Sequence, residues 1–311
     1  MTKTAFHWLP LAACLLFAPA TSFAQQQPAQ DQTQALLQKP HIPGQNVNGL
    51  HVYLRGGLKT HRQGQHDYPQ FVADWSKILT EHGAVVDGSL HSPTAEELKD
   101  VDVIVMYKGD AGFMTSTEKA ALDAFVKRGG GIVIIHDALC GPDPAQFADY
   151  VGGAKKHGEV NFTLGTSVPY KIVDPQHPIM KGMSDMTLFD ESFYRMTWAD
   201  DAKIHVLATA TITDTPSSRR GGGVGQTVPQ IWTYEHTPSG GKPARAFVWM
   251  QGHTYANLQN YQIENMLLRG IAWAGRHPVD ELVSFQSEDL GPGAHEPAES
   301  YLPANGGSAG R

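Results

Sequence analysis

The stretch Gly129–Gly141, GGGIVIIHDALCG, decides the fold class. Four apolar residues, Ile132 to Ile135, follow one another with no polar residue between them. Such a run is typical of a central strand buried on both faces, as in a parallel sheet covered by helices. His136 and Asp137 follow at the carboxyl end of this strand, where open α/β sheets bind their ligands. The pair is therefore a candidate site, although His136 could equally well cap the strand and hydrogen-bond a neighbouring loop.

Strands and helices alternate in the first half of the chain. Strands are expected at residues 50–54, 84–86 and 101–106, and helices at residues 69–82, 93–98 and 115–128. The last helix begins with a capping box, in which Glu118 is placed to reach back to the amide of Thr115. This alternation predicts a doubly wound α/β fold with a parallel sheet.

The second half of the chain is richer in strands. Extended segments are expected at residues 170–173, 204–208, 230–234 and 246–250, and a last helix at residues 261–274. Residues 217–225, SSRRGGGVG, read as a mobile loop, and they lack the Gly-Lys-Ser/Thr ending of a phosphate-binding loop. We expect one domain over residues 49–279 and a flexible tail over residues 280–311, which is rich in Gly and Pro.

The amino terminus has the pattern of a secretory signal peptide. Lys3 precedes the apolar segment Leu9 to Ala20, and Ser22-Phe23-Ala24 fits a small-x-small cleavage site. Cleavage after Ala24 would give a periplasmic or secreted protein, with residues 25–48 as a flexible leader. A lipoprotein box ending at Cys14 is the rival interpretation. No later stretch approaches the roughly 20 apolar residues of a membrane span.

Charge and cysteine content narrow the classes of partner. The chain has 24 basic and 31 acidic residues, so removing Lys3 leaves 23 − 31 = −8. With this balance and no basic stripe, nucleic acid is not an expected partner. Only Cys140 remains after cleavage, which excludes an intramolecular disulfide, and a small buried hydrophobe is its expected role.

Seven motifs in a characteristic order resemble the trehalose-utilisation (ThuA-like) family over roughly residues 50–274. They are Gly56-Gly57 with the His-rich loop to His66, GGGIVIIHDA at 129–138, Gly152-Gly153 followed by His157, His177-Pro178-Ile179, DESFY at 190–194, Gly252-His253 and RGIAWA at 269–274. The resemblance implies a class I glutamine amidotransferase-like fold: a flavodoxin-like, doubly wound, mainly parallel sheet with helices on both faces. Those amidotransferases have a cysteine where His136 stands here. An imidazole suits proton transfer or metal ligation, so amidotransferase activity is not expected.

The resemblance also carries the family's polar positions onto this chain. In this sequence the family's polar positions correspond to His66, His136, His157, Glu191 and His253. We expect His136, Glu191 and His253 to be catalytic and to be candidate ligands of a divalent metal such as zinc. The same three residues could act without metal, with one His as base and Glu191 orienting it. Substrate binding is expected of His66, His157, Asp137 and Tyr194.

The function implied by the resemblance is carbohydrate metabolism. The family is associated with trehalose and related disaccharides, through 3-keto sugar derivatives. Isomerisation, hydrolysis and elimination next to a keto group each begin with proton abstraction, which a histidine or a metal site can perform. Two alternatives remain open: a non-catalytic carbohydrate-binding protein, which has no need of convergent histidines, and a structural domain of the cell envelope. The sequence does not indicate the sugar, the reaction type or the oligomeric state.

Overall fold

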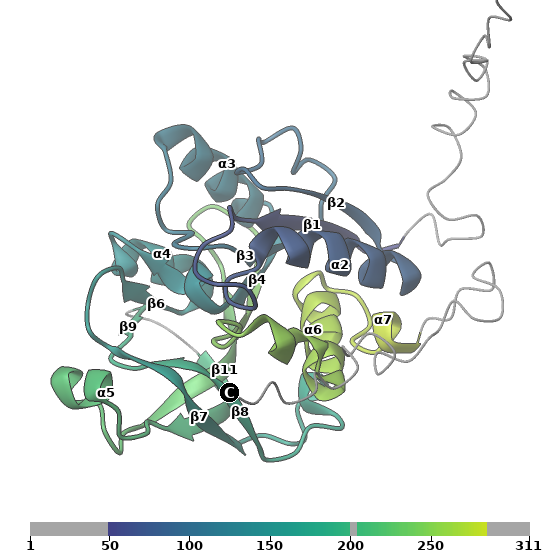
Figure 1. Cartoon of the computed structure of the whole chain (residues 1–311). Helices are drawn as coiled ribbons and strands as arrows, with labels where there is room; N and C mark the ends of the chain where they lie inside the picture. The colour runs from purple at the N-terminus through teal and green to yellow at the C-terminus, as the bar shows by residue number, and fades with distance from the viewer. Residues whose placement is uncertain (1–48, 200–203, 285–311) are drawn as a thin grey trace, which may run out of the picture. The chain divides into compact units, whose positions relative to one another are not determined.

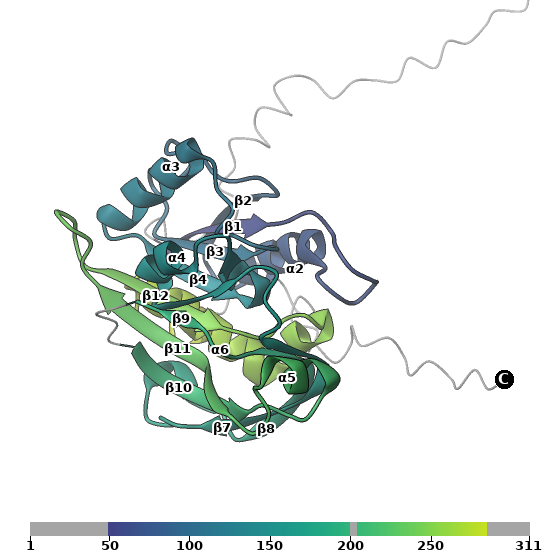
Figure 2. The same cartoon turned by 90° about the vertical axis from the view of Figure 1, so that its left-hand side faces the viewer.

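A nine-stranded sheet runs through the computed structural model, which describes residues 49–199 and 204–284. The strand order is β2-β1-β3-β4-β12-β11-β10-β7-β8 (Figures 1 and 2). The predicted signal peptide and leader, and the tail after residue 284, lie outside the described residues. Within the described ranges, no helix is long and apolar enough to cross a membrane.

The first five strands of this order pair in parallel. They are β2 (Val85–Ser89), β1 (His51–Gly56), β3 (Val103–Tyr107), β4 (Gly131–Ile135) and β12 (Ala244–Trp249). The order 2-1-3-4 with a further parallel strand is the flavodoxin-like arrangement. The predicted α/β class and doubly wound parallel sheet are therefore confirmed.

The remaining strands extend the sheet in antiparallel pairings. They are β11 (Thr227–His236), β10 (Ile204–Thr211), β7 (Phe162–Ile172) and β8 (Met186–Phe193). A separate small sheet contains β5 (Cys140–Gly141), β6 (Gly153–Lys156) and β9 (Thr197–Trp198). Strand β8 was not expected from the sequence, which marked only the acidic-aromatic motif at its end.

Two apolar clusters lie on opposite faces of the parallel strands, and β4 contributes to both. Val133 and Ile135 belong to the cluster with α2 (Tyr68–Glu81) and α6 (Tyr261–Ala274). Ile132 and Ile134 belong to the cluster with α3 (Ser116–Lys127) and α4 (Pro144–Val151). Figure 2 shows these helix pairs on either side of the strands. A strand covered on both faces needs apolar side chains at every position, which explains the unbroken run in its sequence.

Three local expectations are corrected. Residues 93–98 were expected to form a helix, but they form turns: Leu98 N bonds to Thr94 O, whereas Lys99 N bonds to Glu96 O. The following strand begins too soon for a helical ladder to propagate. The expected loop at 217–225 contains helix α5 (Pro216–Gly221), whose first turn is capped by Thr215. A Ser-containing box can cap a short helix that periodicity does not reveal.

The third correction concerns the carboxyl-terminal boundary expected at residue 279. The fold continues through α7 (Glu281–Ser284), and Leu282 is buried in the α2/α6 cluster. The carbonyl of Leu282 lies 2.6 Å from Nδ1 of His82, which follows α2. These contacts attach the segment to the domain. Short 3₁₀ turns complete the described elements: η1 (His136–Leu139), η2 (Pro178–Met180) and η3 (Tyr255–Gln259).

Candidate metal centre

His136 occupies a sharp turn at the carboxyl end of β4. Its φ of 55° lies in the left-handed region, which is uncommon for a residue with a side chain. Its Nδ1 lies 3.1 Å from the carbonyl oxygen of Met250. Because a carbonyl oxygen only accepts, Nδ1 donates this hydrogen bond and Nε2 is left as a bare lone pair. The turn and the hydrogen bond together direct Nε2 into the candidate site.

His66 approaches the same point from the loop after β1. Its Nε2 lies 3.0 Å from Nε2 of His136, and its Nδ1 lies 3.0 Å from the hydroxyl oxygen of Thr60. Its backbone amide donates to the carbonyl of His253 at 3.1 Å. His66 was expected among substrate-binding residues, and the structure brings it into direct contact with the expected catalytic histidine.

Glu191 and His253 complete the group from strand β8 and the loop after β12. Oε2 of Glu191 lies 3.1 Å from Nδ1 of His253 and 3.5 Å from Nε2 of His136. Both ring nitrogens of His253 are buried, and Nε2 has no hydrogen-bond partner among the described residues. Nδ1 faces the carboxylate of Glu191. Unpartnered buried nitrogens are costly unless another group, such as a cation, satisfies them.

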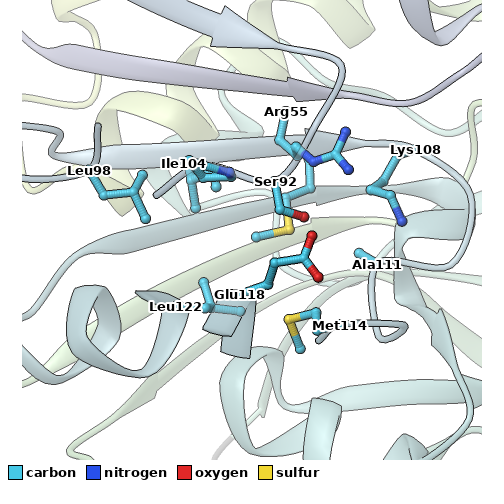
Figure 3. A pocket seen from close by; sticks show the side chains of 11 residues that line it. Arg55, Ser92, Leu98, Ile104, Lys108, Ala111, Met114, Glu118 and Leu122 are labelled. Carbon is cyan, nitrogen blue, oxygen red and sulfur yellow. The ribbon is translucent and has the colours of Figure 1, made fainter. Parts of the chain in front are cut away.

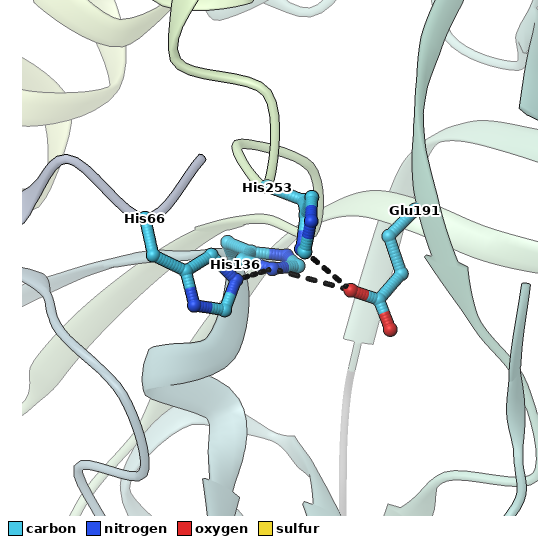
Figure 4. Close-up of side chains that lie close together, drawn as sticks. All are labelled: His66, His136, Glu191 and His253. Atoms are coloured by element: carbon cyan, nitrogen blue, oxygen red, sulfur yellow. Dashed lines mark hydrogen bonds and ion pairs between the residues drawn. The ribbon is translucent and has the colours of Figure 1, made fainter. Parts of the chain in front are cut away.

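We call His66, His136, Glu191 and His253 the histidine cluster (Figure 4). All four residues are buried, and each offers one donor atom within 4.8 Å of those of the others. Burial lowers the pKa of all three histidines, which favours neutral imidazoles. Burial, with the charges of Asp137 and Asp190, raises the pKa of Glu191 well above its usual value. The cluster therefore contains three neutral imidazoles with nitrogen lone pairs and the carboxylate of Glu191, whose charged form is disfavoured. None of its four side chains carries a stable positive charge.

This donor set fits a divalent transition metal. Three neutral imidazoles and one carboxylate are the ligands that zinc takes in many protein sites. Metal-ligating histidines usually donate their second ring nitrogen to a carbonyl or carboxylate, which orients the ring. His136 has this partner in Met250, and His66 has a hydroxyl partner in Thr60. A cation would also pair with Glu191 and offset the unfavourable burial of its charge.

Asp190 is a positioning residue that the sequence did not reveal. Only one carboxylate of the Asp-Glu pair was expected to point inward, yet both are buried. Asp190 accepts hydrogen bonds from the amides of Gly252, His253 and Thr254 at 3.0 to 3.3 Å. It thus fixes the loop that carries His253. Both faces of the end of β8 are covered, so Asp190 and Glu191 are buried although they point to opposite sides of the strand.

The other expected substrate-binding residues fall into two groups. Asp137 lies beside the histidine cluster, where Oδ1 accepts from Cys140 Sγ at 3.0 Å. His157 is exposed, and its Nδ1 lies 2.7 Å from Oδ1 of Asp110, which approaches Asp137 and Cys140.

Tyr194 lies apart from these residues. Its side chain is buried against α5, where its hydroxyl lies 3.4 Å from the carbonyls of Val160 and Ser217. We therefore do not retain Tyr194 as a binding residue. The ring of Phe193 stacks on His136. Successive side chains of an extended strand point to opposite faces, so Tyr194, the next residue, is directed away from the cluster.

Comparison with known protein families shows which family this chain belongs to. The model of the family described as trehalose utilisation (ThuA) matches residues 58–274, which is more than half of the chain. The chain belongs to the ThuA family. Among curated proteins, none matches this ThuA-family chain.

Two solved structures resemble this ThuA-family protein. A putative ThuA-like protein from Parabacteroides merdae has a TM-score of 0.54 and 20% sequence identity, covering 73% of this chain and 90% of that one. A putative ThuA-like protein from Bacteroides uniformis has a TM-score of 0.54 and 16% identity, covering 75% of this chain and 94% of that one. At these identities the likeness concerns the fold, which agrees with the family assignment.

Proposed function

We propose that this protein is a metal-dependent enzyme of carbohydrate metabolism, with the histidine cluster as the ligand set of one divalent metal such as zinc. The single observation that carries the proposal is the convergence of four buried donor atoms, together with a buried Nε2 of His253 that has no hydrogen-bond partner among the described residues. A site built only for structure would satisfy this nitrogen internally. The family description, trehalose utilisation, supports a sugar of the trehalose type as the substrate class. A related disaccharide or its 3-keto derivative is included in the proposal.

The proposed reaction begins with proton abstraction next to a sugar keto group. A divalent metal, when bound, supplies positive charge that stabilises a developing enolate oxygen. Asp137 follows His136 in the chain, and Asp110, which pairs with His157, lies close to Asp137. These residues provide acceptors for sugar hydroxyls or for the abstracted proton. Isomerisation and elimination share this first step, and hydrolysis shares it when elimination is followed by addition of water, so the cluster is compatible with each of them.

A metal-free acid-base site is the second candidate. The 3.0 Å separation between Nε2 of His66 and Nε2 of His136 is within hydrogen-bonding distance. In this alternative, Nε2–H of His66 donates a hydrogen bond to Nε2 of His136. Glu191 is then protonated or shares a proton with His253. The two candidates differ in metal content, which makes them separable.

Elemental analysis tests the proposal. The mature chain is produced without a histidine tag, supplied with zinc, freed of loose metal by gel filtration and analysed by mass spectrometry. About one tightly held metal per chain is expected, with a strong reduction in Glu191→Gln and His253→Ala. His205→Ala is the matched control, because His205 is exposed and pairs with Asp174 outside the cluster. A folded wild-type chain that retains no metal would leave the acid-base candidate.

Export is also part of the proposal, because a signal peptide remains the interpretation of residues 1–24. The mature protein is expected to begin at Gln25 in the periplasm or outside the cell. Intact-mass measurement of the purified protein checks this. A lipid-modified Cys14 at the amino terminus would instead show lipoprotein processing.

A further inference from the structure

A small cavity at the carboxyl edge of the parallel strands lies outside the histidine cluster. Its volume is about 30 Å³, and its walls come from the ends of β1 and β3, the start of α3 and the segment around Ser92. Figure 3 shows the charged ends of Arg55, Lys108 and Glu118 gathered toward one end of the cavity, away from Leu98 and Ile104. A polar end and an apolar wall are typical of a binding pocket.

Arg55 is the unusual residue of this cavity. Only 8% of its surface is exposed, and it forms no ion pair with a carboxylate of the described residues. Its Nη1 donates to the carbonyl of Gly56, whereas the buried Nε has no hydrogen-bond partner. A buried charge normally has an ionic partner, because its removal from water is otherwise strongly unfavourable. Arg55 therefore lacks an acceptor on the Nε edge of its guanidinium group.

Lys108 adds a second positive charge to the same cavity. Its ammonium group donates to the carbonyls of Gly109 and Asp110 and forms no ion pair in the described part of the chain. Burial and the nearby charge of Arg55 lower its pKa to about 8. Glu118 is the one carboxylate that lines the cavity, and its Oε2 accepts from the amide of Thr115 at 2.7 Å. The lining thus carries two positive charges and one negative charge.

The topology places this cavity where α/β proteins bind ligands. In the order β2-β1-β3-β4, the chain builds outward in opposite directions from the pair β1 and β3. The crevice beyond the carboxyl ends of such a pair is the topological switch point, where ligands bind in open α/β sheets. Arg55 lies near the end of β1, and Lys108 directly follows β3. Their placement is independent of the histidine cluster.

We propose that the cavity lined by Arg55, Lys108 and Glu118 binds a carboxylate group. The Nε edge of a guanidinium group presents two parallel N–H donors, which match the two oxygens of a carboxylate. By volume the cavity holds about two waters, the number that two carboxylate oxygens would displace. One added negative charge balances the lining, whereas a divalent phosphate would exceed it. The site does not depend on the proposed metal, and it would accept either a free carboxylate or the acidic end of a larger ligand.

Acetate is the probe that tests this site on the mature full-length chain. Binding is measured by calorimetry and by thermal stabilisation, with ionic strength held constant by the sodium salt of a sulfonate too bulky for the cavity. Saturable binding is expected for the wild type, weakened about tenfold or more in Arg55→Gln and in Lys108→Gln. Lys127→Gln is the matched control, because this exposed lysine lies at the other end of α3 and should bind acetate as the wild type does.

A third variant keeps the test decisive if a charge change prevents folding. Ala111 lines the cavity, so Ala111→Leu fills it without removing a charge and should also abolish acetate binding. Folding of every variant is checked by near-ultraviolet circular dichroism without acetate. Absence of saturable acetate binding to the wild type would overturn the proposal, as would equal binding in the folded variants. Chloride that competes as strongly as acetate would overturn the assignment to a carboxylate.

Discussion

The parallel and antiparallel halves of the sheet contribute to the histidine cluster in different ways. His66, His136 and His253 stand in turns that follow parallel strands β1, β4 and β12, whereas Glu191 lies within antiparallel strand β8. Carboxyl ends of parallel strands meet at one edge, so their turns converge without special arrangement. A residue within a strand reaches that edge only if the strand's register and its neighbours direct it there. The first contribution is therefore inherent in the fold, and the second depends on local packing.

The largest effect is expected from a substitution that disrupts the parallel half of the sheet. Ile134→Asp places an unpaired carboxylate in β4, where the side chain is fully buried, and should prevent folding. Phe189→Asp is the matched change in the antiparallel half. Phe189 is 62% exposed in β8, so this change should alter the unfolding free energy by about 0.5 kcal/mol or less. Soluble yield and melting curves compare the two variants, and normal folding of Ile134→Asp would contradict the central place given to β4.

The next effect concerns how the antiparallel half directs its residues. Asp190→Ala removes the acceptor for three amides of the loop that carries His253. We expect a loss of about 3 kcal/mol of unfolding free energy in metal-free protein, because charged hydrogen bonds are lost and buried donors remain. Asp185→Ala, an exposed change before β8, should cost far less. Urea denaturation of both variants decides whether Asp190 positions this loop.

Metal removal should test how the two halves of the sheet are connected, because the metal would join histidines of the parallel half to Glu191 of the antiparallel half. A ligand that binds only the folded state at 100 times its dissociation constant stabilises by about 2.7 kcal/mol. Chelation should lower the stability of the wild type by a similar amount and that of Glu191→Gln by much less. Thermal unfolding with and without zinc and chelator measures this difference. Equal chelator effects in the two proteins would separate Glu191 from the metal.

The smallest effect is expected at Tyr194, one residue beyond the strand that carries Glu191. Its hydroxyl lies 3.4 Å from two carbonyls, near the limit of hydrogen bonding. Tyr194→Phe should therefore change stability by about 0.5 kcal/mol or less and leave metal content unchanged. A marked loss of metal in this variant would return Tyr194 to the site.

The sequence predicted the parallel strands and also the antiparallel strands β10, β11 and the end of β7, but it did not predict β8, for physical reasons. An unbroken apolar run such as Ile132 to Ile135 has one common explanation, a strand buried on both faces. Asp190 and Glu191 offered no such pattern, because they are polar residues in a strand end that is buried at every position. The unpaired Arg55 was equally hidden, since a sequence does not show whether a charge will find a partner. Contacts between distant segments, such as His66 with His136, arise only from folding.

X-ray absorption at the zinc edge tests the central claim most directly, because it reports the atoms bound to the metal. For zinc-loaded mature protein, the account predicts three imidazole nitrogens at about 2.0 to 2.1 Å and carboxylate oxygen at about 2.0 to 2.2 Å. For the zinc that His253→Ala still binds, the imidazole signal per zinc should fall by about a third. A sulfur ligand at about 2.3 Å would place zinc at Cys140 instead. That result, or a shell of water oxygens without imidazole, would contradict the assignment of the histidine cluster as a metal centre.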